Sequence, residues 1–199
     1  MNRIIILFLF LSGACFSQSF QAGTIIGINT SQVSGDNLAG FNKLGARLGA
    51  FVNKKMGSFT AQIEFQYINK GSKELVDTES YAQGYKFFLN YLEIPISLKT
   101  EVYNKTFLEI GCAVGYLLNW EEEINGYPEG GIEVNNLDYN IHVGFDYKLT
   151  KKLYLNTRLS NSITPIRKHA SEQTYRWNKG QYNTNLSFIL YYYIGNSKN

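Results

Sequence analysis

The stretch DYNIHVGFDYKL, from Asp138 to Leu149, alternates without interruption between two kinds of residue. Its odd-numbered positions from 139 to 147 carry Tyr, Ile, Val, Phe and Tyr, and its even-numbered positions from 140 to 148 carry Asn, His, Gly, Asp and Lys. Successive side chains of an extended chain point to opposite faces. The stretch therefore predicts a β-strand with one apolar face and one polar face.

The same two-residue period recurs in seven other segments, at residues 20–30, 44–52, 59–67, 88–99, 108–116, 153–160 and 185–192. Short connections at 53–57, 101–105 and 150–152 alternate with long ones at 31–42, 70–85, 120–136 and 165–180. An even number of strands with this asymmetry is typical of outer-membrane barrels. We expect an all-β fold, an eight-stranded antiparallel up-and-down transmembrane β-barrel, with both ends of the chain on the short-turn side.

The N-terminus has the three parts of a secretory signal: a basic residue at Arg3, an apolar run at 4–11 and the small and polar stretch SGACFSQS. Cleavage after Ser17 divides the chain into a signal peptide, residues 1–17, and a barrel domain, residues 18–199. An alternative takes residues 12–15 as a lipobox that leaves Cys15 lipidated. In the cleaved form Cys112 is the one remaining cysteine, so no intramolecular disulfide is expected.

Periodicity alone does not say which face of the strands points inward. A soluble lipocalin-like periplasmic barrel, apolar inside, is the alternative to a membrane barrel. The polar face is rich in Gly and Ala, which suits a crowded lumen. Aromatic residues lie near the ends of the apolar faces, as in an interfacial girdle: Phe59, Tyr67, Phe88, Tyr116, Tyr139, Tyr147, Tyr182 and Tyr192. These features favour the outer membrane of a Gram-negative-type bacterium.

Four segments resemble the PorT-like outer-membrane β-barrel family of Bacteroidetes-type bacteria: TIIGINTSQVSGD from Thr24, LNYLEIPISLK from Leu89, GCAVGYLLN from Gly111 and GFDYKLTKKLYLNTRLS from Gly144. The resemblance covers nearly all of the mature chain, and only NYLEIP, residues 90–95, is specific by itself. It implies an eight-stranded barrel and, through PorT, a link to type IX secretion.

The polar face of the expected strands carries a set of charged residues and one histidine. An eight-stranded lumen is narrow enough to be filled by side chains, so these groups should pair with one another and leave no conducting pore. We also expect Pro95, which lacks a backbone N–H inside a strand, to mark a bulge. The expected lumen network consists of Arg47, Glu64, Glu93, Lys99, Glu109, Asp138, His142, Asp146, Lys148 and Arg158.

The third and fourth long loops carry charges of opposite sign and one tryptophan each. The two loops either attract one another, or bind a divalent cation at the acidic loop and lipopolysaccharide phosphates at the basic one. The tryptophans are expected to anchor the outer membrane interface. The loop recognition candidates are Trp120, Glu121, Glu122, Glu123, Arg167, Lys168, Arg176 and Trp177.

No catalytic set appears in the sequence. The two histidines, His142 and His169, stand in no metal-binding spacing, and there is no GxSxG elbow or phosphate loop. We therefore expect no catalytic residues, no metal site and no cofactor, although an outer-membrane lipid-modifying enzyme stays open as an alternative. The net charge of +3 and the lack of a basic stripe argue against nucleic acid.

Because a filled lumen leaves no route for a solute and no catalytic motif is present, binding is the remaining function that we expect for this chain. We expect a barrel without a pore that acts through its external loops as a binding or assembly component of the cell envelope. Its expected partners are outer-membrane lipid and lipopolysaccharide, with other envelope or secretion proteins as further candidates.

Overall fold

The computed structural model describes residues 20–36, 40–74, 84–169 and 179–194. The expected signal peptide, residues 1–17, and two loop candidates, Arg176 and Trp177, lie outside these ranges. All regular structure within the described ranges consists of strands. No helix among these residues has the length and apolar character needed to cross a membrane.

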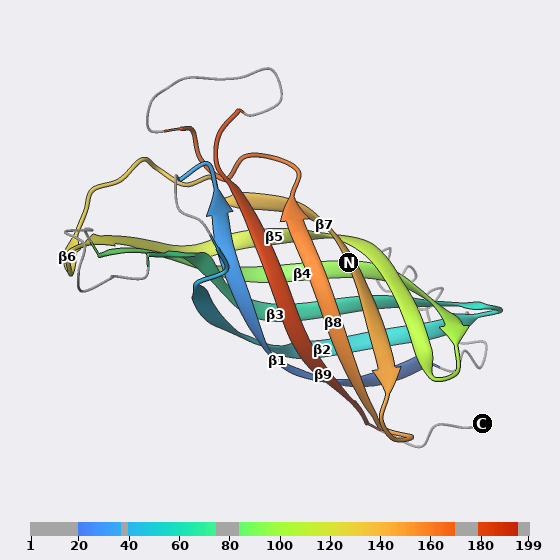
Figure 1. Cartoon of the computed structure of the whole chain (residues 1–199). Coiled ribbons are helices and arrows are strands. Elements are labelled where there is room, and N and C mark those ends of the chain that lie inside the picture. Colours follow the sequence, from blue (N-terminus) through green and yellow to red (C-terminus); the bar gives the residue numbers. More distant parts are fainter. Residues whose placement is uncertain (1–19, 37–39, 75–83, 170–178, 195–199) are drawn as a thin grey trace, which may run out of the picture.

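Eight long antiparallel strands close into a barrel (Figure 1). Each strand pairs with its neighbours along the chain, and β1 pairs with β9 to close the wall, which confirms the up-and-down topology. A two-residue strand, β6, pairs only with the end of β5. The strands are β1 (Phe20–Ser34), β2 (Lys43–Met56), β3 (Phe59–Lys73), β4 (Tyr85–Tyr103), β5 (Thr106–Ile124), β6 (Tyr127–Pro128), β7 (Leu137–Lys148), β8 (Leu153–Ser162) and β9 (Tyr182–Ile194).

The two faces of the wall are oriented as in a membrane barrel. On β7 the apolar positions point outward, with Ile141 53% and Phe145 54% exposed, while His142 and Asp146 are buried at 6% and 3%. The other long strands repeat this pattern, so an apolar band surrounds a polar interior. The lipocalin-like alternative, which requires an apolar interior, is therefore wrong.

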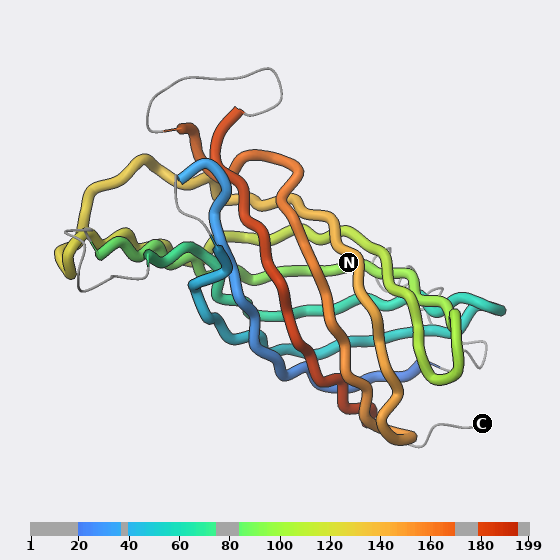
Figure 2. The backbone as a smooth tube through the Cα atoms, viewed as in Figure 1, coloured from blue at the N-terminus to red at the C-terminus, as the bar shows by residue number. Residues whose placement is uncertain are grey.

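Three strands continue past the rest of the barrel at the long-loop end (Figures 1 and 2). The β2–β3 ladder ends at the pair Arg47 and Ile68, whereas β3 and β4 stay paired out to Lys73 and Lys86, and β4 and β5 out to Tyr85 and Ile124. We call this extension the loop arm; it comprises residues 69–73, 85–90 and 119–124.

Because of the loop arm, two of the long connections begin later in the chain than the sequence predicted. The connections expected at 70–85 and 120–136 begin later, because β3 runs to Lys73 and β5 runs to Ile124. The polar residues at these positions continue the strand alternation, and hydrogen bonds between β3, β4 and β5 hold them in the sheet.

The wall also differs from expectation at Pro95. The register between β3 and β4 is the same on both sides of this residue, since Ile63 pairs with Ile96 and Gln66 with Glu93. The expected bulge at Pro95 is therefore wrong. An irregularity lies instead between β4 and β5, where Tyr91 pairs with Leu117 and the preceding residue, Asn90, pairs with Asn119, which leaves one extra residue on β5.

The lumen is closed by packed side chains at both ends. At the long-loop end, the loop seal contains Val33, Ile68, Phe87, Leu89, Tyr91, Leu117, Val134 and Ile166. At the short-turn end, the turn seal contains Ile25, Phe51, Ile189 and Tyr191, with Tyr154 and Tyr193 packed against them. Val134 and Ile166 come from the two long connections that follow β6 and β8, so these connections fold over the mouth. The buried charged residues of the strands lie between and beside the members of these two seals.

Candidate functional site

The centre of the lumen holds an ion-pair cluster around Arg158 of β8. Its guanidinium donates hydrogen bonds to both carboxylate oxygens of Glu64 on β3, at 3.1 and 2.7 Å, and to Glu109 on β5, at 2.5 Å. The Tyr191 hydroxyl accepts a bond from Arg158 at 2.6 Å and donates one to Glu64 at 2.7 Å. Strands β3 and β8 are not neighbours in the wall. These bonds therefore cross the lumen and connect its opposite sides.

Further ion pairs lie on either side of this cluster. Toward the loop arm, the Lys70 amine is 2.6 Å from Glu93 and 3.1 Å from Asp138. Toward the short turns, Lys99 donates to Asp146 at 2.6 Å. A buried ion that loses its partner costs several kcal/mol, so this network should tolerate single substitutions poorly.

The structure buries nine of the ten residues expected in the lumen, and the exception is Lys148, which is half-buried. Lys148 lies at the short-turn end with its amine 5.8 Å from the ring centroid of Tyr154. Arg47 is buried 4.0 Å from Glu93, and its guanidinium has no hydrogen-bond partner in the described part of the chain.

Lys70 also belongs to the ion-pair network of the lumen, although it was not among the residues predicted there from the sequence. It supplies a fifth cation against the five buried carboxylates, but the sequence analysis placed it at the start of a loop. A signal was available, because Gln66, Ile68, Lys70 and Ser72 continue the inward-facing positions of β3.

A serine, a histidine and a glutamate also meet in the lumen, which the sequence reasoning did not anticipate. Ser97 Oγ lies 2.9 Å and Glu109 Oε1 lies 3.6 Å from the same nitrogen of His142, Nε2. A catalytic triad uses both ring nitrogens, one for the nucleophile and one for the carboxylate. All three residues are buried between the seals. This arrangement is therefore unsuited to act on a substrate.

At the mouth, Arg167 ties the connection after β8 to the loop arm. Its guanidinium donates to the two carboxylate oxygens of Glu122 on β5, at 2.7 and 3.1 Å, and to the side-chain oxygen of Gln181 at 2.5 Å. The Tyr85 hydroxyl donates to Glu122 at 2.6 Å. The guanidinium also lies 4.1 Å from the ring centroid of Phe87 in the loop seal. We call Tyr85, Glu122, Arg167 and Gln181 the mouth clamp.

The mouth clamp changes the acidity of its members. Burial alone would raise the pKa of the Glu122 carboxyl, but hydrogen bonds from Arg167 and Tyr85 outweigh burial and hold that pKa below its ordinary value. Burial and the bond to Glu122 raise the pKa of Tyr85. Glu122 is thus held as an anion and Tyr85 as a neutral donor.

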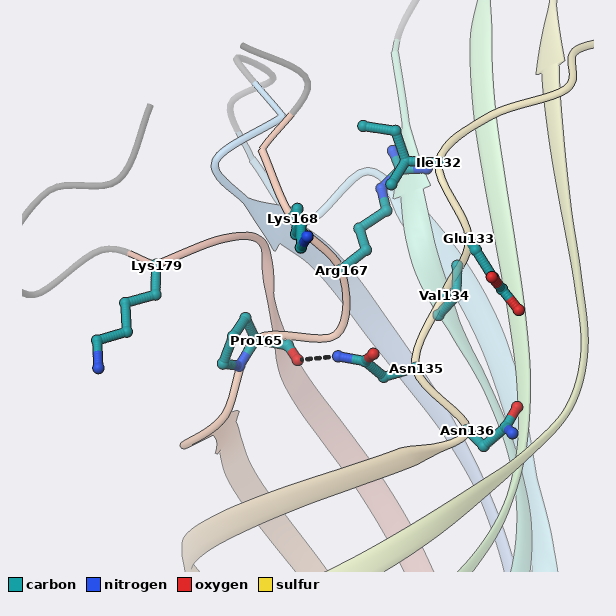
Figure 3. A pocket seen from close by; sticks show the side chains of 9 residues that line it. All are labelled: Ile132, Glu133, Val134, Asn135, Asn136, Pro165, Arg167, Lys168 and Lys179. Carbon is teal, nitrogen blue, oxygen red and sulfur yellow. Dashed lines mark hydrogen bonds between the residues drawn. The ribbon is translucent and has the colours of Figure 1, made fainter. Parts of the chain in front are cut away.

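Beside the mouth clamp lies an open pocket of about 640 Å³ (Figure 3). It is formed between the connection that follows β6 and the two ends of the connection between β8 and β9. Asn135 donates its side-chain amide to the Pro165 carbonyl at 2.9 Å and so joins these connections. Figure 3 shows Lys168 and Lys179 on one side of the pocket and Glu133 on the other. The lining residues are Ile132, Glu133, Val134, Asn135, Asn136, Pro165, Arg167, Lys168 and Lys179.

The other loop candidates lie on β5. Trp120 is half-buried and packs against the loop seal, with its ring centroid 6.3 Å from that of Phe87, and its role as an outer interface anchor stays a prediction. Glu121, Glu122 and Glu123 were expected together in a loop, but they alternate along the strand, and only Glu122 points inward. Glu123 pairs with Lys86 at 3.2 Å. No group of three or more His, Cys, Asp or Glu within the described ranges is placed to hold a metal ion.

The chain belongs to the family of outer membrane protein β-barrel domains, whose sequence profile matches residues 16–168. It is therefore an outer-membrane barrel, and barrels of this kind carry their long loops on the external side. A search of curated proteins finds no match.

Solved structures with the same fold include Ail, the attachment invasion locus protein of Yersinia pestis, in complex with the heparin analogue sucrose octasulfate. Ail is 11% identical to this chain, with a TM-score of 0.51 over 88% of this chain and 99% of Ail. Neisserial surface protein A is 10% identical, with a TM-score of 0.47 over 87% of this chain and 96% of that protein. At such identities the similarity concerns the fold alone.

Proposed function

We propose that this protein is a non-conducting outer-membrane barrel that binds an anionic ligand at the pocket beside the mouth clamp. The observation that carries the proposal is the charge of the pocket. Lys168 and Lys179 line it, and neither lysine makes an ion pair within the described part of the chain. Arg167, the third cation of the pocket, is already paired with Glu122. The pocket thus offers two available ammonium groups against the single carboxylate of Glu133.

The chemistry of the pocket favours phosphate or sulfate groups. Ammonium groups bind such oxyanions by charge-assisted hydrogen bonds. The clamp between Arg167 and Glu122 holds one wall in place, and the bond from Asn135 to Pro165 holds another, so the lysines project from anchored connections. Anchoring reduces the ordering cost of binding.

The packed interior supports the proposal that the barrel does not conduct. A solute would have to displace the loop seal, the ion-pair cluster around Arg158 and the turn seal in turn. Each of these is packed or hydrogen-bonded across the lumen. The barrel then serves as a rigid support for its external surface. The family match and the solved structures do not single out PorT, so a link to type IX secretion stays a prediction.

Binding of a soluble polyanion tests the proposal. Sucrose octasulfate, the ligand in the Ail structure, is a suitable probe. Titration calorimetry in detergent micelles should show binding that weakens with salt, because exposed charges are screened. The double variant Lys168→Gln, Lys179→Gln should bind about two- to thirtyfold more weakly, since exposed charge pairs contribute about 0.2–1 kcal/mol each.

The matched control replaces two lysines at the short turns, Lys105→Gln and Lys151→Gln, which lie at the other end of the barrel. This control changes the net charge by the same amount and should bind like the unmodified protein. Equal losses in both double variants would indicate a general charge effect, and no loss in either would place binding elsewhere. Both outcomes contradict the proposal.

A further inference from the structure

A second pocket opens where the loop arm separates from β2. The β2–β3 ladder stops at Arg47 and Ile68, so the first residues of β2 are not paired with β3. The pocket between them has a volume of about 250 Å³, about eight times the volume of one water molecule in the liquid. We call it the wall notch. It is lined by Asn42, Lys43, Leu44, Lys73, Lys86 and Phe88.

Three of the six lining residues are lysines. Lys73 and Lys86 are directly opposite each other on β3 and β4, and directly opposed side chains lie on the same face of a sheet. Like charges in such a pair are destabilising. Only Lys86 has a partner on the neighbouring strand, Glu123 at 3.2 Å, and Lys73 has no ion pair among the described residues. An anion in the notch would offset this repulsion.

The third lysine is fixed from inside the notch. Lys43 is 3% exposed, and its amine donates to the Leu44 carbonyl at 3.2 Å and to the side-chain oxygen of Asn69. The same amine lies 4.8 Å from the ring centroid of Phe88. Its acceptors are both uncharged, so no carboxylate among the described residues neutralises it. The notch therefore combines a held cation with two cations on the wall beside it.

The notch lies at the edge of the apolar band. Leu44 is 71% exposed on the outward face of β2 and continues the row of Leu48 and Val52. On β3 and β4 the outward positions change from apolar, at Ile63 and Ile96, to amide at Asn69 and Asn90. Beyond one further outward residue on each strand, Gly71 and Phe88, they change to lysine. This order, apolar then amide then cationic, matches the change from acyl chains to headgroups in a lipid leaflet.

We propose that the wall notch binds a phosphate group of lipopolysaccharide in the outer leaflet, with Lys43, Lys73 and Lys86 around the phosphate and the acyl chains beside Leu44. A lipid is the fitting source because the notch opens sideways from the wall at the boundary of the apolar band. Phosphate is the fitting group because it can receive hydrogen bonds from several ammonium groups at once. This site is separate from the mouth pocket and does not depend on the proposed function.

The test measures lipid binding to the full-length mature protein in phosphatidylethanolamine nanodiscs. The probes are lipopolysaccharide that carries its lipid A phosphates, the same material after removal of those phosphates, and inorganic phosphate. We expect the phosphorylated form to bind, and the double variant Lys73→Gln, Lys86→Gln to bind it about tenfold or more weakly, given about 1 kcal/mol per lysine near an anionic membrane surface. Lys43 is left unchanged because it is buried.

Two controls separate this proposal from general effects and from the mouth pocket. The turn variant Lys105→Gln, Lys151→Gln and the mouth variant Lys168→Gln, Lys179→Gln should both keep lipid binding. The notch variant should keep sucrose octasulfate binding and should show the same heat-dependent gel shift as the unmodified barrel, which reports that it has folded.

Three results would overturn the proposal. The first is equal binding of the phosphorylated and dephosphorylated lipid, and the second is unchanged lipid binding by the folded notch variant. The third is binding of inorganic phosphate as tight as that of the lipid, which would identify a site for free phosphate.

Discussion

Arg158 on β8 and Glu64 on β3 form a bidentate ion pair across the lumen, with nitrogen–oxygen distances of 3.1 and 2.7 Å. The two residues are 94 positions apart in the chain, and both are at most 1% exposed. Three strands, β2, β1 and β9, separate them around the wall. Side chains thus connect opposite sides of the barrel directly, in addition to the hydrogen bonds around its circumference.

The first prediction concerns this pair. Arg158→Met should lower the free energy of unfolding by about 3–5 kcal/mol, because it leaves Glu64 and Glu109 buried without their cation. Urea unfolding in detergent micelles, followed by tryptophan fluorescence, measures the loss. Lys148→Met, at a half-buried position, is the matched control and should cost much less. Equal costs for the two variants would show that the cluster contributes little to stability.

The second prediction concerns conduction. Pure protein in planar bilayers should give no steady single-channel currents, because both seals and the ion pairs between them fill the lumen. Steady and sizeable currents would refute a filled interior. In that case Glu93→Ala should change the ion selectivity, since Glu93 lies in the lumen beside Lys70.

The third prediction uses Cys112, which is exposed on the outward face of β5 between Ile110 and Val114. In a membrane this thiol should face lipid near the middle of the apolar band. A membrane-permeant maleimide should label it faster than a water-soluble one. Ser58→Cys, at an exposed turn, provides the control that both reagents should label. Rapid labelling of Cys112 by the water-soluble reagent would contradict the assignment of the outward face.

The fourth prediction is a pH dependence of the mouth clamp. Because the folded-state pKa of Glu122 lies below its unfolded value, its stabilising contribution is complete above the unfolded pKa of about 4.3 and is lost as the pH falls through the folded pKa. Amide hydrogen exchange near Arg167 should therefore accelerate at acidic pH. Glu122→Gln should remove most of this dependence, whereas Glu133→Gln should retain it. An identical pH profile in the Glu122 variant would contradict the mechanism.

The sequence predicted the wall of this barrel well because the constraint is local. Each strand has one face toward lipid and one toward the lumen, so a period of two assigns the side of residues such as Ile141 and His142 without knowledge of their partners. The short turns are equally local. The same reasoning misplaced Glu121 and Glu123, because charged residues on an outward face were read as a loop, although the strand continues beyond the membrane there.

The partners inside the lumen could not be predicted. Lys70 contacts Asp138, which is 68 residues away, and which cation meets which carboxylate depends on strand tilt and stagger. The extra residue on β5 beside Leu117 also shifts the alternation, and no sequence signal marked it. At Pro95 the sequence predicted a bulge that is absent. The strand accommodates the missing backbone N–H without a change of register between β3 and β4.

The seam between β1 and β9 has a consequence for how the barrel matures. These strands come from opposite ends of the folded chain, so the seam is the contact with the greatest separation in sequence, and we expect it to form late. A slip of β9 by one residue there would turn Asn185 and Ser187 toward lipid and bring Leu186 and Phe188 into the lumen. It would also move Arg158 away from Glu64. The cross-lumen ion pairs therefore form only when β1 and β9 pair in the correct register, and they stabilise that closed barrel over one with a shifted seam.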